Sequence, residues 1–208
     1  MHPVSPLVHL VDDDDAVRAA LSLLIGTVGL RVAAWADPLQ FLERFDRDAV
    51  GAIVLDVRMP GMSGLSVLEQ LRREGADQPV ILLTAHGTVD MCRRAFKEGA
   101  AEFLEKPVDD EPLLDAVQAA VRAHVRSRQR DAAGREARER YALLSPRERE
   151  VLALVVAGLS SKEIARALAL SPRTVETHRL HLSAKLQVQT LAQLIRRYAN
   201  LVDADGAA

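Results

Sequence analysis

The chain has 208 residues, 49% of them hydrophobic and 27% charged, which is typical of a globular protein and excludes a disordered or fibrous one. A single cysteine, Cys92, excludes a disulfide framework and indicates a reducing compartment. The first six residues contain no basic segment followed by an apolar core, and glycines and Arg31 interrupt the apolar stretch over residues 21–36. We therefore expect no signal peptide, no membrane span and a cytoplasmic location.

The net charge of −2 conceals an asymmetry between the two parts of the chain. Residues 1–121 carry 20 acidic and 11 basic side chains, whereas residues 122–208 carry 9 acidic and 16 basic ones. This imbalance predicts two domains with different partners, and the basic domain is the better candidate for binding nucleic acid.

The acidic part alternates short apolar runs with segments whose apolar residues recur at helical spacing. The expected strands are residues 8–11, 32–35, 52–55, 79–83 and 103–105. The expected helices cover about residues 17–28, 38–45, 64–75, 88–97 and 113–121. Five strands that alternate with five helices predict an α/β domain built on a doubly wound, five-stranded parallel sheet.

The ends of these strands carry the polar residues of interest. Asp56 follows residues 52–55, an apolar run typical of a strand buried on both faces. Right-handed crossovers bring all the strand ends to one edge of the sheet, which is where such folds bind ligands. That edge is expected to collect Asp12, Asp13, Asp56, Thr84 and Lys106.

Three carboxylates at one edge repel one another unless a cation neutralises them. Oxygen ligands without His or Cys favour magnesium, and a metal beside a lone aspartate, with an ammonium opposite, suits phosphoryl transfer onto that carboxylate. The alternative for the acidic run is a solvated helix cap, which we prefer for Asp14 and Asp15. We do not prefer it for Asp12 and Asp13, because they coincide with the other residues of the edge.

The basic part begins with residues 122–142, a segment rich in Arg, Ala and Glu that is typical of a solvated helix or linker prolonging the preceding helix. Serines at positions expected for helix caps then open three short helices, two of them with capping boxes. A fourth helix should follow, giving a smaller all-α helix-turn-helix domain. The expected features are capping boxes at 145–148 and 160–163, helices at 172–186 and 190–198, and a frayed tail at 202–208.

The third of these short helices is the candidate for contacting bases. At 100° per residue its apolar residues Val175, Leu182 and Leu186 share one side. We expect central side chains of the other side to reach base edges and flanking cations to reach phosphates, although a generic solvated face has the same pattern. The opposite side holds Arg173, Glu176, Thr177, Leu180, His181 and Ala184, flanked by His178 and Lys185.

Residues 7–122 resemble the receiver domain of two-component response regulators. The resemblance rests on Asp12-Asp13, Asp56, Met59-Pro60-Gly61, Thr84 and Lys106-Pro107. It implies a CheY-like fold in which Asp56 accepts a phosphoryl group from a sensor histidine kinase, without enzymatic activity beyond this self-phosphorylation. It also implies that magnesium is bound by Asp13, Asp56 and the backbone carbonyl of Arg58, with Asp12 acting through water. Lys106 would pair with the phosphoryl oxygens, Thr84 would turn its hydroxyl toward them, and Phe103 would be the switch aromatic that moves inward.

Residues 140–202 resemble the LuxR-type helix-turn-helix domain, and residues 123–139 would be a linker helix. The resemblance rests on the frame of residues 144–152, 158–160, 163–165, 171–178 and 185–186. The two domains together are similar to the FixJ/NarL class of response regulators, on its FixJ-like side. This class implies a transcription regulator that binds promoter DNA as a phosphorylation-induced dimer, with RNA polymerase as a further candidate partner and no contact with a membrane. The implied DNA contacts are Arg173, Thr174, Glu176, Thr177, His178, Leu180, His181 and Lys185.

One departure and two rival interpretations remain open. Many relatives carry lysines where this chain has Glu176 and Leu180, so base contacts assigned to those lysines do not transfer. A haloacid-dehalogenase-like phosphatase also forms an aspartyl phosphate, but it expects a second Asp two residues after the nucleophile, where this chain has Arg58. In the other alternative, the chain binds DNA constitutively and its first domain serves only dimerisation. Within the regulator hypothesis, the receiver could inhibit DNA binding by masking or only by preventing dimerisation.

Overall fold

The computed structural model describes residues 5–206. The expectation of no signal peptide rests partly on residues 1–4, which lie outside the described part. The chain divides into two compact units, one ending at Arg128 and the other beginning at Gln129. The helix α5 (Asp110–Ala142) runs through this division as a single helix of 33 residues. The expectation that residues 122–142 prolong the preceding helix is therefore confirmed.

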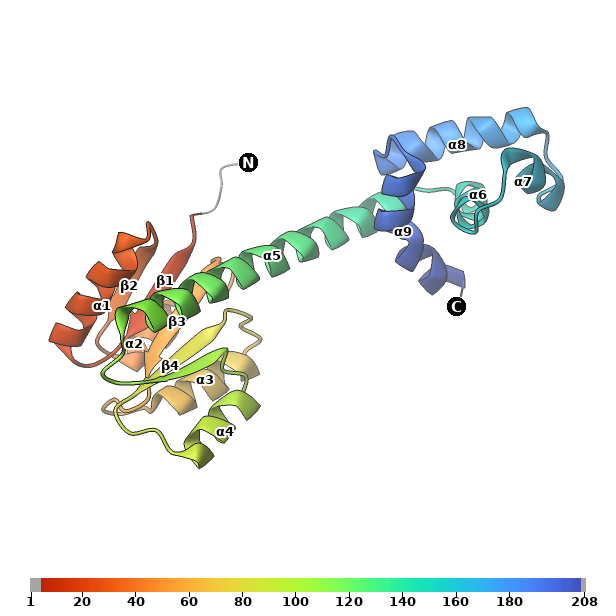
Figure 1. Cartoon of the computed structure of the whole chain (residues 1–208). Coiled ribbons are helices and arrows are strands. Elements are labelled where there is room, and N and C mark those ends of the chain that lie inside the picture. Colours follow the sequence, from red (N-terminus) through yellow and green to blue (C-terminus); the bar gives the residue numbers. More distant parts are fainter. Residues whose placement is uncertain (1–4, 207–208) are drawn as a thin grey trace. The chain divides into compact units, whose positions relative to one another are not determined.

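The first unit is built on a five-stranded parallel sheet with the strand order β2-β1-β3-β4-β5 (Figure 1). Each strand pairs with its neighbours in parallel, and Val54 of β3 lies beside Leu10 of β1 and Ile81 of β4. The expected topology is confirmed. The strands are β1 (Leu7–Val11), β2 (Arg31–Trp35), β3 (Gly51–Asp56), β4 (Val80–Thr84) and β5 (Glu102–Glu105).

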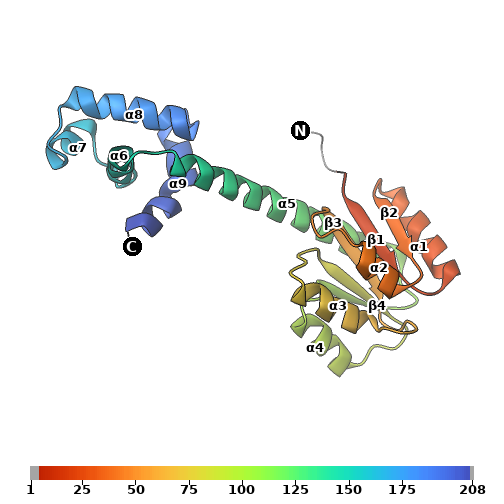
Figure 2. The same ribbon diagram turned by 180° about the vertical axis from the view of Figure 1, so that it is seen from behind.

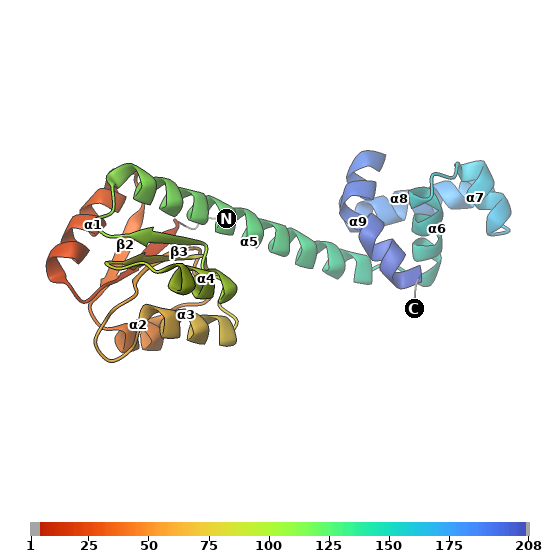
Figure 3. The ribbon, with the colours of Figure 1, turned by 60° about the horizontal axis from the view of Figure 1, so that its bottom comes forward.

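Helices cover both faces of this sheet, as Figure 3 shows. The helices α1 (Asp15–Thr27) and α5 lie on one face, and α2 (Pro38–Arg44), α3 (Gly64–Arg73) and α4 (Val89–Lys97) lie on the other. Successive residues of β3 alternate between two apolar clusters, with Val54 in the α1–α5 cluster and Leu55 in the α2–α4 cluster. Every residue of β3 is buried. Because both faces are covered, the strand needs an unbroken apolar run rather than an alternating one.

The second unit is a helical domain whose parts appear from behind in Figure 2. Both expected capping boxes are present, with Ser145 and Glu148 at the start of α6 and Ser160 and Glu163 at the start of α7. One apolar cluster joins all its helices to the end of α5 through Ala137. The helices are α6 (Pro146–Val156), α7 (Ser161–Ala167), α8 (Pro172–Leu186) and α9 (Leu191–Gly206).

The expected tail over residues 202–208 is wrong for the part that the structure describes. The last helix, α9, continues to Gly206, and residues 207–208 lie outside the described part. Leu201 and Val202 pack against the cluster of the second unit, in helical register with Leu194 and Tyr198. This packing favours helix where local composition alone suggested fraying. No described helix is long and apolar enough to cross a membrane.

Candidate functional site

Of the five residues expected at the sheet edge, Asp12, Asp56 and Lys106 are in direct contact there. Asp12 follows β1, Asp56 ends β3, Thr84 ends β4 and Lys106 follows β5. The Lys106 ammonium lies 2.6 Å from Asp12 Oδ2 and 2.6 Å from Asp56 Oδ1. Asp12 is 1% exposed and Asp56 is 6% exposed. Two nearly buried carboxylates therefore share one ammonium.

Burial and the neighbouring charges shift the pKa values of Asp56 and Lys106 in opposite directions. Burial raises the pKa of Asp56, and the hydrogen bond from Lys106 opposes that rise without abolishing it. Burial by itself would lower the pKa of Lys106, but its hydrogen bonds to Asp12 and Asp56 outweigh the effect and raise that pKa. The Asp56 carboxylate is also oriented by the backbone N–H of Arg58, which donates to its Oδ2 at 2.7 Å. A desolvated, oriented carboxylate beside a cation is suited to accept a phosphoryl group.

The remaining members of the acidic run have different surroundings. Asp14 is the N-cap of α1 and accepts hydrogen bonds from the backbone N–H groups of Ala16 and Val17, which lower its pKa. Asp15 pairs with Arg18 on the same helix. The preference for a helix-cap role at Asp14 is thereby confirmed. Asp13 is exposed beside the buried Asp12.

The donor set suits a hard cation. Asp12, Asp13 and Asp56 offer only carboxylate oxygens, and the point between Asp12 and Asp56 already holds a positive charge, that of Lys106. Among residues 5–206, no three acidic, His or Cys side chains are grouped closely enough to form a ready-made metal site. The oxygen donors of the expected ligands are of the type that magnesium prefers, and magnesium would complete its coordination with water.

Thr84 of β4 and Phe103 of β5 both border Gly87. The Thr84 hydroxyl donates to the carbonyl of His86 at 3.2 Å, so it is directed toward its own loop rather than toward Asp56. A Cβ placed on Gly87 would lie 3.2 Å from the Phe103 ring and 3.6 Å from the Thr84 methyl group. A side chain at position 87 would therefore press on the Phe103 ring.

Sequence reasoning missed a pair at the mouth of the site. The Arg58 guanidinium lies 2.9 Å from Nδ1 of His86, and both side chains are exposed. The two residues follow different strands and are 28 positions apart, so spacing alone could not pair them. The available signal was that each residue lies two positions after a residue of the site, Asp56 or Thr84.

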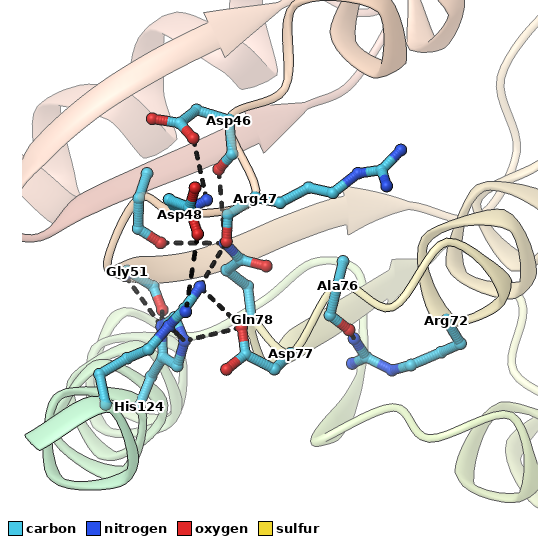
Figure 4. A network of polar contacts seen from close by, with 11 residues as sticks. Asp46, Arg47, Asp48, Gly51, Arg72, Ala76, Asp77, Gln78 and His124 are labelled. Atoms are coloured by element: carbon cyan, nitrogen blue, oxygen red, sulfur yellow. Dashed lines mark hydrogen bonds and ion pairs between the residues drawn. The ribbon is translucent and has the colours of Figure 1, made fainter. Parts of the chain in front are cut away.

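A polar network at the opposite edge of the sheet holds α5 (Figure 4). The ring Nδ1 of His124, which is 3% exposed, lies 3.1 Å from the amide nitrogen and 3.0 Å from the carbonyl oxygen of Gly51. Its Nε2 lies 3.2 Å from Asp77, which also pairs with Arg128 at 3.0 Å. Arg128 in addition donates to the carbonyl of Arg47. The network therefore holds α5 to Gly51, the first residue of β3, and to the loops that carry Arg47 and Asp77. Its last residue on α5 is Arg128, where the first unit ends.

The surface beside Phe103 is a groove of about 470 Å³ between α4 and β5. Val89 is 76% exposed and Phe96 is 47% exposed along it. Large apolar side chains exposed together, rather than singly, are typical of interaction surfaces. The lining residues are Gly87, Thr88, Val89, Cys92, Arg93, Phe96, Phe103 and Glu105.

In the second unit, α8 presents the face that the helical spacing predicted. Val175, Leu182 and Leu186 are buried, and Leu180 is 70% exposed. Arg179 is directed back to α7, where it donates to the Ser161 hydroxyl at 3.1 Å. The side chains left exposed are Arg173, Glu176, Thr177, Leu180, His181, Ala184 and Lys185, with Thr174 and His178 half-buried. Lys185 is exposed but bound, since its ammonium donates to Glu148 of α6 at 2.7 Å.

Known families match both units. Residues 8–118 match the response regulator receiver domain, and residues 142–198 match the bacterial regulatory proteins of the luxR family. The transcriptional regulatory protein FixJ of Azorhizobium caulinodans is 44% identical over 99% of this chain and 98% of its own length.

Solved structures agree with these matches over nearly the whole chain. The response regulator StyR is 37% identical with a TM-score of 0.81, and covers 94% of this chain and 99% of its own. Full-length FixJ from B. japonicum is 35% identical with a TM-score of 0.60, and covers 95% of this chain and 97% of its own.

Proposed function

The chain belongs to the two-component response regulators that join a receiver domain to a LuxR-type DNA-binding domain, and from this premise we propose that Asp56 is its phosphoacceptor. It is a transcriptional regulator. We propose further that its phosphoryl donor is a sensor histidine kinase and that the chain is not an enzyme acting on a separate substrate.

The observation that carries the Asp56 assignment is the shared ammonium. Lys106 reaches Asp12 and Asp56 at equal distances, and of the two only Asp56 lies in a strand whose every residue is buried. A backbone N–H two residues further along the chain donates to each carboxylate, at 3.0 Å for Asp12 and 2.7 Å for Asp56, so this contact does not separate them. Asp56 is the more exposed of the two, and we assign it as the carboxylate that can exchange the Lys106 contact for a phosphoryl group.

The reaction follows from this arrangement. A carboxylate oxygen of Asp56 attacks the phosphorus of a phosphohistidine, and the bond from phosphorus to the ring nitrogen breaks as the imidazole leaves. Lys106 keeps its contact with Asp12 and pairs with a phosphoryl oxygen, which stabilises the transferred charge. Magnesium held by Asp13, Asp56 and the carbonyl of Arg58, with Asp12 acting through water, would neutralise further phosphoryl charge when bound.

Thr84 and Phe103 would pass this change to the α4–β5 groove. A hydroxyl drawn toward the phosphoryl group gives up its bond to the His86 carbonyl, and the ring packed beside it can move inward. The groove carries exposed Val89 and Phe96, whose burial between two copies would favour a dimer of the phosphorylated chain. A population shift of this kind needs a differential free energy of only a few kcal/mol.

The DNA contacts are proposed for the exposed face of α8. Arg173, His178 and His181 would contact phosphates or base edges, and Thr174, Glu176, Thr177 and Leu180 would contribute hydroxyl, acceptor and apolar contacts. Leu180 can offer only apolar contact, so a thymine methyl group is its expected partner. Double-stranded promoter DNA is the proposed partner, with RNA polymerase a candidate for contact once the regulator is bound.

Phosphorylation with acetyl phosphate and magnesium tests the assignment. Asp56→Asn should take up no phosphate, whereas Asp13→Asn should be slow and Asp14→Asn should behave as the parent chain. Acid-labile phosphate on Asp56→Asn would overturn the proposal. If phosphorylation left DNA affinity and dimer content unchanged, the constitutive alternative would hold instead.

A further inference from the structure

The Lys185 ammonium has a partner inside the DNA-binding unit. It lies 2.7 Å from Oε2 of Glu148, a residue only 4% exposed in the first turn of α6. The same oxygen accepts the backbone N–H of Ser145, the N-cap of α6, at 2.7 Å. Glu148 therefore joins the last turn of α8 to the first turn of α6.

Glu148 is ionised at neutral pH. Burial by itself raises the pKa of Glu148, but the hydrogen bonds from Lys185 and Ser145 outweigh it and hold that pKa at about 2. Moving Lys185 onto a DNA phosphate would leave a buried carboxylate without its cation. Such a loss is more costly than a solvent-exposed phosphate contact returns.

Other contacts fix the same end of α8. The carbonyl of Leu186 accepts from the Tyr198 hydroxyl of α9 at 2.9 Å and from Arg140, near the end of α5, at 3.5 Å. Gln187 then ends the helix in the left-handed conformation, with φ of 51°. Three helices thus converge on the last turn of α8, and its exposed contact face begins three turns earlier at Arg173.

We propose that Lys185 is a positioning residue. Through Glu148 it fixes the last turn of α8, and so the direction in which the face from Arg173 to His181 meets the bases, and it makes no phosphate contact. The inference rests on the proposed DNA-contact face of α8. It replaces the expectation, drawn from helical spacing alone, that Lys185 is a flanking phosphate ligand.

The test uses the full chain activated with beryllofluoride and two duplexes, one selected from random sequence by the parent chain and one unselected. Affinities are measured over a salt series for Lys185→Ala, Lys185→Arg, Glu148→Gln and the control Arg173→Ala. We expect Lys185→Ala and Glu148→Gln each to reduce the preference for the selected duplex about tenfold, with the log–log salt slope unchanged. Lys185→Arg should keep most of the preference, and Arg173→Ala should flatten the slope by about one unit per bound chain.

Glu148→Gln separates the two roles of Lys185 by the sign of its effect. Glu148→Gln removes the negative charge that holds Lys185. If Lys185 is a phosphate ligand, this variant should bind both duplexes more tightly. If Lys185 is a positioning residue, the variant should bind the selected duplex more weakly. Tighter binding by Glu148→Gln, or a slope about one unit flatter in Lys185→Ala, would overturn the proposal. If Lys185→Ala unfolds, Lys185→Gln leaves the capping box of Glu148 intact and keeps a hydrogen-bond donor for its carboxylate. Only the positioning role predicts that Lys185→Gln retains the preference with an unchanged salt slope. An unchanged slope in Arg173→Ala would instead count against the proposed α8 face.

Discussion

Lys106 and Asp56 are 50 positions apart in the sequence, but in the folded chain the Lys106 ammonium lies 2.6 Å from Asp56 Oδ1. Removing the ammonium in Lys106→Met leaves Asp12 and Asp56 as neighbouring buried charges, which raises the pKa of Asp56 and withdraws the cation that would stabilise the phosphoryl group. We expect phosphorylation by acetyl phosphate to slow at least tenfold, about 1.4 kcal/mol in the barrier. The rate is read from acid-labile phosphate over time.

Lys97→Met is the matched control for this change. Lys97 is an exposed lysine in the last turn of α4, and no ion pair joins it to the site among the described residues. Its removal should leave the rate within a factor of two of the parent chain. Equal rates for Lys106→Met and Lys97→Met would remove Lys106 from the reaction.

Gly64 should tolerate no side chain, because α3 begins against the strand that carries Asp56. A Cβ at Gly64 would lie 2.1 Å from the backbone oxygen of Asp56, and neither backbone can move without displacing β3. We expect Gly64→Ala to lower the free energy of unfolding of the first unit by more than about 2 kcal/mol. Urea unfolding followed by the fluorescence of Trp35, the chain's one tryptophan, measures this.

Gly134→Ala is the matched control, and it should increase stability where Gly64→Ala lowers it. No atom lies within 4 Å of a Cβ at Gly134, which lies in the second half of α5. Alanine there should increase the helix content by circular dichroism, with a gain of up to about 1 kcal/mol in helix stability. A loss of helix in Gly134→Ala would show that α5 needs the glycine.

The sequence was sufficient for the sheet and for the residues at its edge. Apolar runs such as residues 52–55 identify strands that helices cover on both sides, and parallel topology then brings Asp12, Asp56, Thr84 and Lys106 together. These expectations depend only on local pattern and on connection handedness. The same holds for the capping boxes of α6 and α7, whose partners are three residues apart.

Side-chain pairs away from the carboxyl ends of the strands could not be predicted. Spacing on α8 placed Lys185 correctly at the edge of the exposed face, yet its partner Glu148 lies 37 positions earlier on another helix. His124 likewise showed no sign of its contacts with Gly51 and Asp77. Such contacts depend on how helices pack, which a single sequence does not specify, and so does the extension of α9 beyond Tyr198.

His9 should make the first unit less stable in mild acid. It is 5% exposed, its Nδ1 accepts from the Trp35 ring nitrogen at 3.2 Å, and its Nε2 has no hydrogen-bond partner among the described residues. Burial lowers its pKa below the ordinary value of 6.5, and the opposing effect of Asp46 is smaller. The unfolded chain therefore binds the proton more readily, so stability is full above about pH 6.5 and falls as the pH drops below it.

We expect the free energy of unfolding of the first unit to decrease between pH 7.5 and pH 5. Urea titrations at the two pH values measure this decrease. His9→Asn keeps an acceptor for Trp35 but cannot take up a proton, so its free energy of unfolding should depend less on pH. An identical pH dependence in parent and variant would assign the acid sensitivity to other groups.

The α4–β5 groove should carry the phosphorylation-dependent dimer. Phe96→Asp places a carboxylate where an exposed ring lines the groove, and burying that charge between two copies would cost several kcal/mol. We expect the variant to take up phosphate on Asp56 at the parental rate but to remain monomeric at micromolar concentration with beryllofluoride. Sedimentation velocity gives the dimer content, and Leu39→Asp, an equally exposed apolar position on α2, should dimerise as the parent chain does. A dimer that forms normally in Phe96→Asp, or fails equally in Leu39→Asp, would move the interface away from α4.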